Sequence, residues 1–372
     1  MRITFILPFA GHRPVGGFKV VYEYANGLAT RGHEVAVVHA PYLVPGETSI
    51  LRRVRQLGVY LVRKAGVGGG YTPQKWFRID PRVRLLWLPS LHCRWVPAGD
   101  VVVATAWETA EAVGAYPASK GRKFYLIQHQ ESMFAGVDVT RVMKTWTAPL
   151  AKIVIAQWLA DIAAELGEQS TYIPNGLDFA TFGLDVPITV RTPHRLIMLY
   201  HHHDWKGSHD GLQAMEQVRA AVPELEATLF GILPRPASLP PWVNYVQKPT
   251  QALLRQLYNE AAIFVGPSWA EGWPLPPAEA AQCGAALCLT DIGGHREYAS
   301  HNETALLSAA REPRALADNI LSLVQDHELR HRLAEAGYQY MARFTWERAV
   351  TSMERTLSGV MGDGGYSRAA PH

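Results

Sequence analysis

The chain has 372 residues, of which 48% are hydrophobic and 19% are charged, and its formal net charge at pH 7 is only +3. This length exceeds one ordinary hydrophobic core and predicts two domains, while the composition excludes a disordered chain and gives no reason to expect a nucleic-acid partner. No run approaches the ~20 apolar residues of a membrane-spanning helix. The apolar run at residues 3–10 is too short for a secretory signal, and three cysteines without metal-ligand spacing predict no disulfide framework, so we expect a cytoplasmic protein.

Strands and helices alternate from the first residues onward. Residues 3–7 are predicted to form a strand, a turn-rich loop follows, and apolar residues at helical spacing predict a helix over 18–30. Gly32 ends this helix before a strand at 35–39, an order typical of a parallel α/β unit. Further strands are predicted at residues 83–88, 101–104, 124–128, 153–155 and 171–173. A doubly wound, Rossmann-like domain is therefore expected over residues 1–182.

The alternation restarts after a segment, 182–193, that contains prolines and shows no periodicity. Strands are predicted at 196–200, 227–231, 263–266 and 286–290, and helices at 208–222, 251–261, 277–283, 313–326 and 328–343. A second doubly wound domain over 183–345 is the simplest account, followed by a terminal helix at 346–361 and a flexible tail at 362–372. Open α/β sheets bind ligands at the carboxyl ends of their strands, so we expect the two domains to face each other across a cleft.

Residues 51–64 combine several arginines and one lysine with leucines and valines. This composition is compatible with a helix that rests on an anionic membrane surface, which would place the protein peripherally at the inner face of the membrane. The simpler interpretation is a solvated helix face whose arginine stems lie along apolar surface.

Residues 264–279, with the sequence FVGPSWAEGWPLPPAE, join a buried strand to a helix through a loop. Glu271 lies in the loop and Glu279 lies in the first turn or so of the helix, so both carboxylates can face one ligand. A carboxylate accepts two hydrogen bonds and suits a ribose diol, while the N–H groups of Gly272, Trp273 and the helix start suit phosphate oxygens. The alternative is structural: Glu279 would interact with the helix dipole and Glu271 would simply be exposed.

This segment and its continuation resemble the signature of the retaining GT-B glycosyltransferases of the "glycosyl transferases group 1" type, which includes glycogen synthases and bacterial mannosyltransferases. The residues that carry the resemblance are Pro267-Ser268, Glu271-Gly272, Glu279, Cys283-Gly284, Asp291, Gly293-Gly294 and Glu297. It extends to the sequence IPNGLD at residues 173–178 and to Phe344–Trp346, where the family begins a final helix that crosses back to the first domain. The resemblance does not extend to residues 45–100.

The resemblance implies a two-domain GT-B fold and a nucleotide-sugar donor. It places Glu271 beside the donor sugar, together with the backbone of Gly272 and Trp273, and it implies that Glu279 holds the ribose hydroxyls. The family usually has Gly-Phe-Gly where this chain has Gly272-Trp273-Pro274, so one backbone N–H is missing here.

A second predicted donor-binding loop is YHHHDWKG, residues 200–207, at the end of the strand that opens the second domain. Lys206 could neutralise a diphosphate from this strand end. In the family that this chain resembles, an Arg and, five residues later, a Lys-Gly pair bind the diphosphate. Lys206-Gly207 matches the Lys-Gly pair, but His201 stands in place of the Arg. Either the histidines at 201–203 take over part of this role or another cation does. Three adjacent histidines on an extended strand do not converge on one metal, so we expect a structural or phosphate-binding role and no metal.

Three features of the first domain could also meet the substrates. Gly16 and Gly17 open a helix after the first strand, where backbone can approach an anion, although many such turns use glycine for geometry alone. The resemblance places this glycine loop against the donor phosphates and the acceptor, and it assigns a donor-sugar contact to His129. A core or surface role for His129 is the alternative. Trp107 and Glu131, which follow predicted strands, are candidates for the acceptor side by position.

The chain contains no Asp-x-Asp, so no metal or other cofactor is expected, and Lys206 and backbone N–H groups must meet the charge of the leaving group. The resemblance implies retention of configuration, with Glu271, Lys206 and His129 in the catalytic site. We expect a front-face displacement onto a hydroxyl of a polysaccharide, a lipid-linked glycan or a small metabolite. The alternatives are a related phosphorylase or epimerase, and a catalytically degenerate GT-B module that only binds sugar nucleotides.

Overall fold

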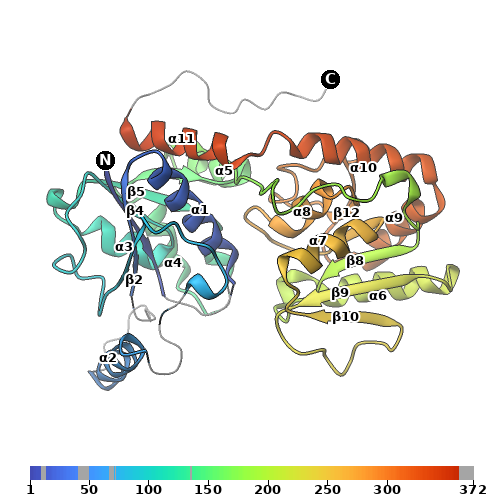
Figure 1. Ribbon diagram of the computed structural model, residues 1–372, viewed down its shortest axis with the longest axis horizontal. Coiled ribbons are helices and arrows are strands. Elements are labelled where there is room, and N and C mark those ends of the chain that lie inside the picture. The colour runs from blue at the N-terminus through green and yellow to red at the C-terminus, as the bar shows by residue number, and fades with distance from the viewer. Residues whose placement is uncertain (10–13, 41–49, 67–70, 72, 135, 360–372) are drawn as a thin grey trace. The chain divides into compact units, whose positions relative to one another are not determined.

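The computed structural model describes residues 1–9, 14–40, 50–66, 71, 73–134 and 136–359, without the side chains of residues 52 and 53. The chain forms two compact units, one made of Met1–Asn175 together with the residues from Trp346 onward, and the other of Gly176–Thr345 (Figure 1). We call them unit 1 and unit 2. No helix in the described ranges is long and apolar enough to cross a membrane.

Unit 1 is built on a parallel sheet of seven strands in the order β3-β2-β1-β4-β5-β6-β7. The strands are β1 (Arg2–Leu7), β2 (Glu34–His39), β3 (Arg84–Trp87), β4 (Val101–Ala104), β5 (Arg122–Ile127), β6 (Ala151–Val154) and β7 (Ser170–Tyr172). The helices are α1 (Gly16–Thr30), α2 (Ile50–Lys64), α3 (Trp107–Gly114), α4 (Val139–Trp146), α5 (Gln157–Glu165) and α11 (Trp346–Ser358). The strand order reverses direction between β1 and β4, which makes this pair the switch point of the sheet.

The last described helix, α11, packs against α1 of unit 1. Arg31 and His33, at and beyond the end of α1, both contact the carboxylate of Glu354, at 2.7 Å each. The ring of Tyr24 meets the ring of Trp346 edge-on, with centroids 5.5 Å apart. The first strand and the last described helix therefore belong to the same unit.

Unit 2 has a parallel sheet of six strands in the order β10-β9-β8-β11-β12-β13. The strands are β8 (Arg195–Leu199), β9 (Glu226–Gly231), β10 (Val243–Gln247), β11 (Ile263–Gly266), β12 (Ala286–Thr290) and β13 (Ala305–Ser308). The helices are α6 (Ser208–Ala221), α7 (Gln251–Glu260), α8 (Leu275–Gln282), α9 (Pro313–Gln325) and α10 (His327–Met341). Strands β11 and β12 are buried along their whole length, as expected for a parallel sheet covered on both faces. The switch point of this sheet lies between β8 and β11.

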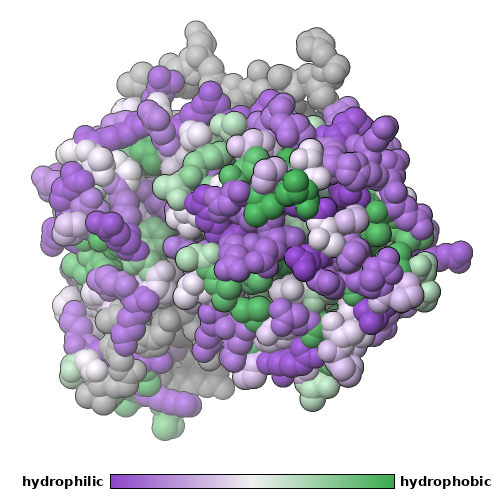
Figure 2. All heavy atoms as spheres, turned by 45° about the vertical axis from the view of Figure 1, so that its right-hand side comes forward, coloured by the Kyte–Doolittle hydropathy of each residue, from purple (hydrophilic) through white to green (hydrophobic). Residues whose placement is uncertain are grey.

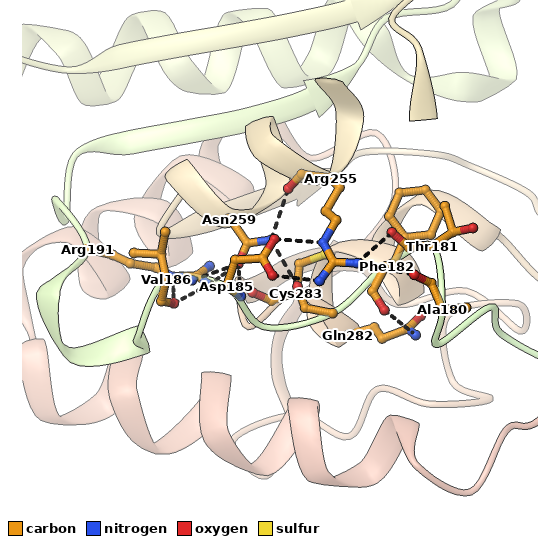
Figure 3. Close-up of polar contacts among 11 residues, drawn as sticks. Ala180, Thr181, Phe182, Asp185, Val186, Arg191, Arg255, Asn259, Gln282 and Cys283 are labelled. Atoms are coloured by element: carbon orange, nitrogen blue, oxygen red, sulfur yellow. Dashed lines mark hydrogen bonds and ion pairs between the residues drawn. The ribbon is translucent and has the colours of Figure 1, made fainter. Parts of the chain in front are cut away.

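The segment expected to be a linker is bound tightly into unit 2 (Figure 3). The guanidinium of Arg255 in α7 pairs with Asp185, and the side chain of Asn259 donates to the carbonyl of Gly183 at 2.9 Å. The side chain of Gln282 in α8 donates to the carbonyl of Phe182 at 2.9 Å. Arg255 also donates to the carbonyl of Thr181 at 3.1 Å, so the contacts of α7 with this segment begin before residue 182. The division between the units falls after residue 175, whereas the sequence placed it after residue 182.

The predicted α/β class is confirmed, because all strand pairs in both sheets are parallel in the described structure. The sequence did not predict β10, β13 or the short helices α3, α4 and α5. Helices of eight or nine residues give too few turns for a clear helical period. Figure 2 shows a face covered mainly by hydrophilic side chains, with hydrophobic ones in small separate patches.

Candidate functional site

The two loops singled out from the sequence in unit 2 lie at the switch point of its sheet. Strands β8 and β11 pair in parallel, with Leu196 opposite Ile263. The chain leaves β8 toward β9 on one side and leaves β11 toward β12 on the other, so the loops after β8 and β11 diverge at their carboxyl ends. Ligands bind open α/β sheets at such points. The loop after β8 carries His201 and Lys206, and the loop after β11 carries Glu271.

Lys206 and Glu271, 65 positions apart in the sequence, form an ion pair at this point. The ammonium nitrogen of Lys206 lies 2.7 Å from Oε1 and 2.9 Å from Oε2 of Glu271. Both side chains are largely buried. An ammonium group has three N–H donors, so one donor remains for a ligand after the carboxylate has taken two. The ion pair therefore presents a carboxylate and an ammonium group side by side, and their charges nearly cancel.

Glu271 is held in its ionised form by its neighbours. Burial alone raises the pKa of this carboxyl, but the adjacent Lys206 ammonium and a hydrogen bond from the Ser268 hydroxyl, at 2.8 Å, outweigh burial and lower the pKa below its ordinary value. An ionised carboxylate can only accept hydrogen bonds, so it suits the hydroxyl groups of a sugar.

A buried network fixes the loop that carries Glu271. The hydroxyl of Thr290, at the end of β12, donates to the carbonyl of Ser268, and Nδ1 of His295 lies 2.7 Å from the carbonyl of Thr290. This contact requires the proton of His295 on Nδ1, and burial lowers the pKa of His295 to about 4, so the ring is neutral at pH 7. The sequence motif contained Ser268 and His295 but did not reveal their contacts.

Two glycines of the motif are required by close backbone approach. Gly207 has φ +61°, and a Cβ there would lie 2.0 Å from the carbonyl oxygen of Pro267. A Cβ on Gly294 would lie 2.5 Å from the carbonyl oxygen of Glu271. Real Cβ atoms do not come so close to backbone, so these glycines hold the loops after β8 and β11 together. The hydrogen bond from the N–H of Trp269 to the carbonyl of Trp205, at 2.7 Å, joins the same two loops.

His201 does not supply the positive charge that the family's arginine would. Burial and the nearby Lys206 lower the pKa of His201 to about 4, so the ring is neutral at pH 7. Its Nδ1 accepts the N–H of His203 at 3.2 Å, which places the ring proton on Nε2. His201 can therefore donate one hydrogen bond to a phosphate but cannot neutralise its charge.

The rings of the three histidines at 201–203 lie closer to one another than they would in an extended strand. The ring centroids are 4.1 to 4.7 Å apart, and one ligand atom from each lies within 4.8 Å of the others. Tetrahedral ligands at about 2.05 Å from a metal would lie roughly 3.3 Å apart, so the rings would have to move to bind one ion together. The expectation that adjacent histidines point apart is wrong for this loop.

Glu279 and Trp273 both lie inside unit 2. Glu279, in the second turn of α8, is buried. The ring of Trp273, only 5% exposed, packs on Tyr298 and Phe344, with centroids 5.0 and 5.5 Å away. Only the backbone of Trp273 and its neighbour Gly272 can serve a ligand in this position, as the resemblance implies.

The start of α8 offers fewer N–H donors than we expected for a helix N-terminus. The helix begins at Leu275 with Pro274 as its N-cap, and the next two positions are Pro276 and Pro277. Proline has no N–H, so Leu275 is the one donor among these four residues. The first turn of α6, which follows Gly207, contains no proline and is the better helix terminus for a phosphate.

The candidate residues of unit 1 lie around its own switch point. Gly16 and Gly17 open α1, which follows β1, and Trp107 opens α3, which follows β4. A Cβ on Gly17 would lie 3.2 Å from Oε1 of Gln128, whereas a Cβ on Gly16 would meet nothing within 4 Å. Gln128 was not selected from the sequence. Its Oε1 is buried without a hydrogen-bond partner in the described structure, which makes its amide a further candidate for ligand contact.

Glu131 stabilises the local structure of unit 1. Its Oε2 accepts the N–H of Trp107 at 2.8 Å and the hydroxyl of Tyr125 at 3.1 Å. Burial and the nearby Glu108 raise the pKa of Glu131 to about 8, so the carboxyl is mostly protonated at pH 7. The side chain of Trp107 is buried. The ring of His129 packs against Phe134, with centroids 4.8 Å apart, and lies nearly perpendicular to the ring of Trp158, with centroids 6.1 Å apart.

The sequence of this chain is similar to those of known glycosyltransferases. Residues 190–340 match the family "Glycosyl transferases group 1". An uncharacterized glycosyltransferase of Methanocaldococcus jannaschii is 30% identical over 112 residues, which are 28% of this chain and 32% of that protein. The phosphatidyl-myo-inositol mannosyltransferase of Mycolicibacterium smegmatis is 21% identical over 98% of this chain and 95% of that protein.

Among solved structures, HepE of Anabaena in complex with UDP and glucose superimposes with a TM-score of 0.70 at 15% identity, over 97% of this chain and 100% of that one. This similarity shows the fold, which is the GT-B fold predicted from the sequence.

Proposed function

We propose that this chain, which has the GT-B fold, is a group 1 glycosyltransferase that transfers a sugar from a nucleotide-sugar donor to a hydroxyl of its acceptor with retention of configuration. The observation that carries the proposal is the buried pair of Lys206 and Glu271 at the switch point of unit 2. This pair supplies a carboxylate for sugar hydroxyls and a cation for a diphosphate within one hydrogen-bonded group.

The donor lies over the loops after β8 and β11. Glu271 accepts hydrogen bonds from the sugar hydroxyls, beside the backbone of Gly272 and Trp273, and Glu279 holds the ribose. Lys206 gives its third N–H to the diphosphate, and neutral His201 donates one hydrogen bond from Nε2. The N–H groups in the first turn of α6 supply further donors, which compensate for the prolines at the start of α8.

The reaction is a front-face displacement. The bond between the anomeric carbon and the diphosphate oxygen breaks, and the acceptor oxygen forms its bond on the same face through an oxocarbenium-like state. The departing phosphate oxygen takes the proton of the acceptor hydroxyl, so no separate base is needed. Lys206 stabilises the charge that develops on the leaving group, and Glu271 positions the donor without forming a covalent bond. No metal takes part in this proposal.

The acceptor side belongs to unit 1, around the switch point where Gly16, Gly17, Trp107 and Glu131 lie. The acceptor is a hydroxyl of a polysaccharide, a lipid-linked glycan or a small metabolite. Phosphatidylinositol is the first compound to test, because a relative that aligns over nearly the whole chain is a phosphatidyl-myo-inositol mannosyltransferase.

Two observations favour a second candidate function, a module that binds sugar nucleotides without turnover. The neutral His201 and the three prolines at 274, 276 and 277 remove a positive charge and backbone donors from the leaving-group side. Fewer contacts to the diphosphate lower the rate of transfer more than they lower the affinity for the donor, because the charge on the leaving group is largest in the transition state.

The first experiment measures thermal stabilisation of the purified chain by UDP, GDP, dTDP and ADP, since a ligand that binds the folded state raises its apparent stability. One nucleotide should stabilise the wild-type protein. The Glu279→Gln variant should lose this stabilisation, whereas Glu216→Gln, on the exposed side of α6, should keep it. The matching nucleotide sugars are then tested for transfer and hydrolysis, and the anomeric configuration of the product is determined by NMR.

Retained configuration, together with loss of turnover in Lys206→Met and Glu271→Gln, supports the proposal. An inverted product contradicts the front-face mechanism. Selective nucleotide binding without any turnover across the three acceptor classes supports the non-catalytic module instead.

A further inference from the structure

Helix α2 turns its apolar side away from the protein. Leu51 is 83% exposed, Ile50 is 78% exposed and Val54 is 64% exposed. The remaining large apolar residues of the helix, Leu57, Val59, Leu61 and Val62, are also exposed. A surface helix normally buries such a stripe against the core. Figure 1 shows α2 apart from the sheet of unit 1.

The opposite side of α2 makes the contact with unit 1. Gln56, Tyr60 and Arg63, spaced four and three residues apart, are the partly buried positions. The hydroxyl of Tyr60 donates to the carbonyl of Trp87 at the end of β3, at 2.9 Å. The guanidinium of Arg63 lies 5.8 Å from the centroid of the Tyr71 ring. The helix is thus attached through its polar side, and this attachment directs the apolar stripe to solvent.

The exposed stripe is continuous along the helix. Ile50, Val54, Leu57 and Leu61 follow one another at spacings of four, three and four residues, which places them on one face. Leu51 and Val62 widen this face on one side. The helix has 15 residues and is therefore ~22 Å long. An exposed apolar surface of this kind marks an interaction site.

The charges of α2 indicate what covers the stripe. Residues 50–64 include five basic residues and no Asp or Glu. At 100° per residue, the exposed residues Arg55 and Lys64 lie on the two borders of the stripe. A surface that matches this helix is apolar in its interior and anionic at its edge, which is the profile of a bilayer with anionic headgroups.

We propose that α2 lies in the headgroup region of an anionic bilayer, with its apolar stripe toward the acyl chains and with Arg55 and Lys64 against lipid phosphates. The polar contact of Tyr60 with Trp87 holds the helix on unit 1 in the orientation that this docking requires. Membrane attachment would bring the switch point of unit 1 to the surface where lipid-borne hydroxyl acceptors are found. The docking itself does not depend on the proposed glycosyl transfer.

The test is cosedimentation of the full chain with vesicles of phosphatidylcholine alone and with about 30% phosphatidylglycerol, in about 0.1 M salt. The wild-type protein should bind the anionic vesicles at least tenfold more strongly than the neutral ones. The double variant Leu51→Asp, Leu61→Asp should lose at least tenfold in binding, and so should Arg55→Glu, Lys64→Glu. These side chains are exposed, and the contact of the Lys64 ammonium with the carbonyl of Trp87 is long, at 3.5 Å, and open to solvent, so the variants should keep the circular dichroism spectrum and melting temperature of the wild type.

The matched control is Val190→Asp, Leu166→Asp, two exposed apolar residues outside α2, which should bind within twofold of the wild type. Equal binding of the wild type to both vesicle types overturns the proposal, and so does unchanged binding of Leu51→Asp, Leu61→Asp. A wild-type dimer that becomes monomeric in Leu51→Asp, Leu61→Asp, as measured by light scattering, would show that a second copy covers the stripe. The assay contains neither donor nor acceptor, so its result is independent of whether transfer is detected.

Discussion

Arg191 connects the segment at residues 182–193 to the core of unit 2, and its replacement tests how strongly this segment is held. The side chain is 6% exposed, and burial lowers its pKa to about 10. Its guanidinium donates to the carbonyls of Tyr258 and Ala261 at 3.2 and 3.0 Å. It also donates to the carbonyl of Val186 at 2.9 Å and to that of Cys283 (Figure 3). Methionine keeps the aliphatic stem and removes all of these donors.

The expected loss follows from these hydrogen bonds. Hydrogen bonds from a charged group contribute about 1.5–3 kcal/mol each, but they share one guanidinium whose burial is itself costly, so the contributions do not add. We expect Arg191→Met to lower the free energy of unfolding of unit 2 by about 3–5 kcal/mol. For a unit of this size, that corresponds to a decrease in melting temperature of roughly 6–20 °C.

The assay is differential scanning calorimetry of the wild type, Arg191→Met and the control Arg195→Met. Arg195 pairs with Glu226 at 2.8 Å, but both side chains are about half exposed, and such pairs contribute roughly 1 kcal/mol or less. Limited proteolysis should cut residues 182–190 faster in Arg191→Met alone. If Arg191→Met melts no lower than Arg195→Met, the carbonyl contacts of Arg191 do not hold the segment, and the reasoning is refuted.

Three further predictions concern the loops after β8 and β11. Gly207→Ala should destabilise unit 2 by at least 1–2 kcal/mol in urea unfolding, which is about the cost of a left-handed backbone for alanine. The control Gly16→Ala has open space around its Cβ and should change the free energy of unfolding by less than about 0.5 kcal/mol. Equal effects of the two substitutions would contradict the role of Gly207. His201→Arg should raise nucleoside-diphosphate affinity roughly tenfold in calorimetric titration at pH 7, because arginine supplies the charge that the neutral His201 lacks; unchanged affinity would place His201 away from the phosphates. Lys206→Met should destabilise the protein most above the ordinary carboxylate pKa of 4.5, where Glu271 is ionised, and the difference from the wild type should shrink as the pH falls through the lowered pKa of Glu271 in the folded wild type. A difference in melting temperature that stays constant between pH 7 and pH 3 would exclude the ion pair as its cause.

Much of the fold can be predicted from the sequence because buried parallel strands are continuous apolar runs. Strands β4, β11 and β12 were predicted with the bounds that the structure has. The short helices α3, α4 and α5 were missed, because eight or nine residues give little periodicity, and the register between strands cannot be predicted from apolar runs alone. The loops after β8 and β11 could be recognised in advance, because their residue types and spacing are specified along the chain.

By itself, the sequence determined the α/β class, the positions of most strands, the family resemblance and the amphipathic character of residues 51–64. Only the tertiary structure decided which groups meet. It paired Lys206 with Glu271 and Arg255 with Asp185 across 65 and 70 positions, and it buried His201 enough to keep its ring neutral. It also turned the apolar side of α2 outward. Composition and periodicity are local properties of the chain, whereas a pKa, an ion pair or the orientation of a helix depends on neighbours that are distant in sequence.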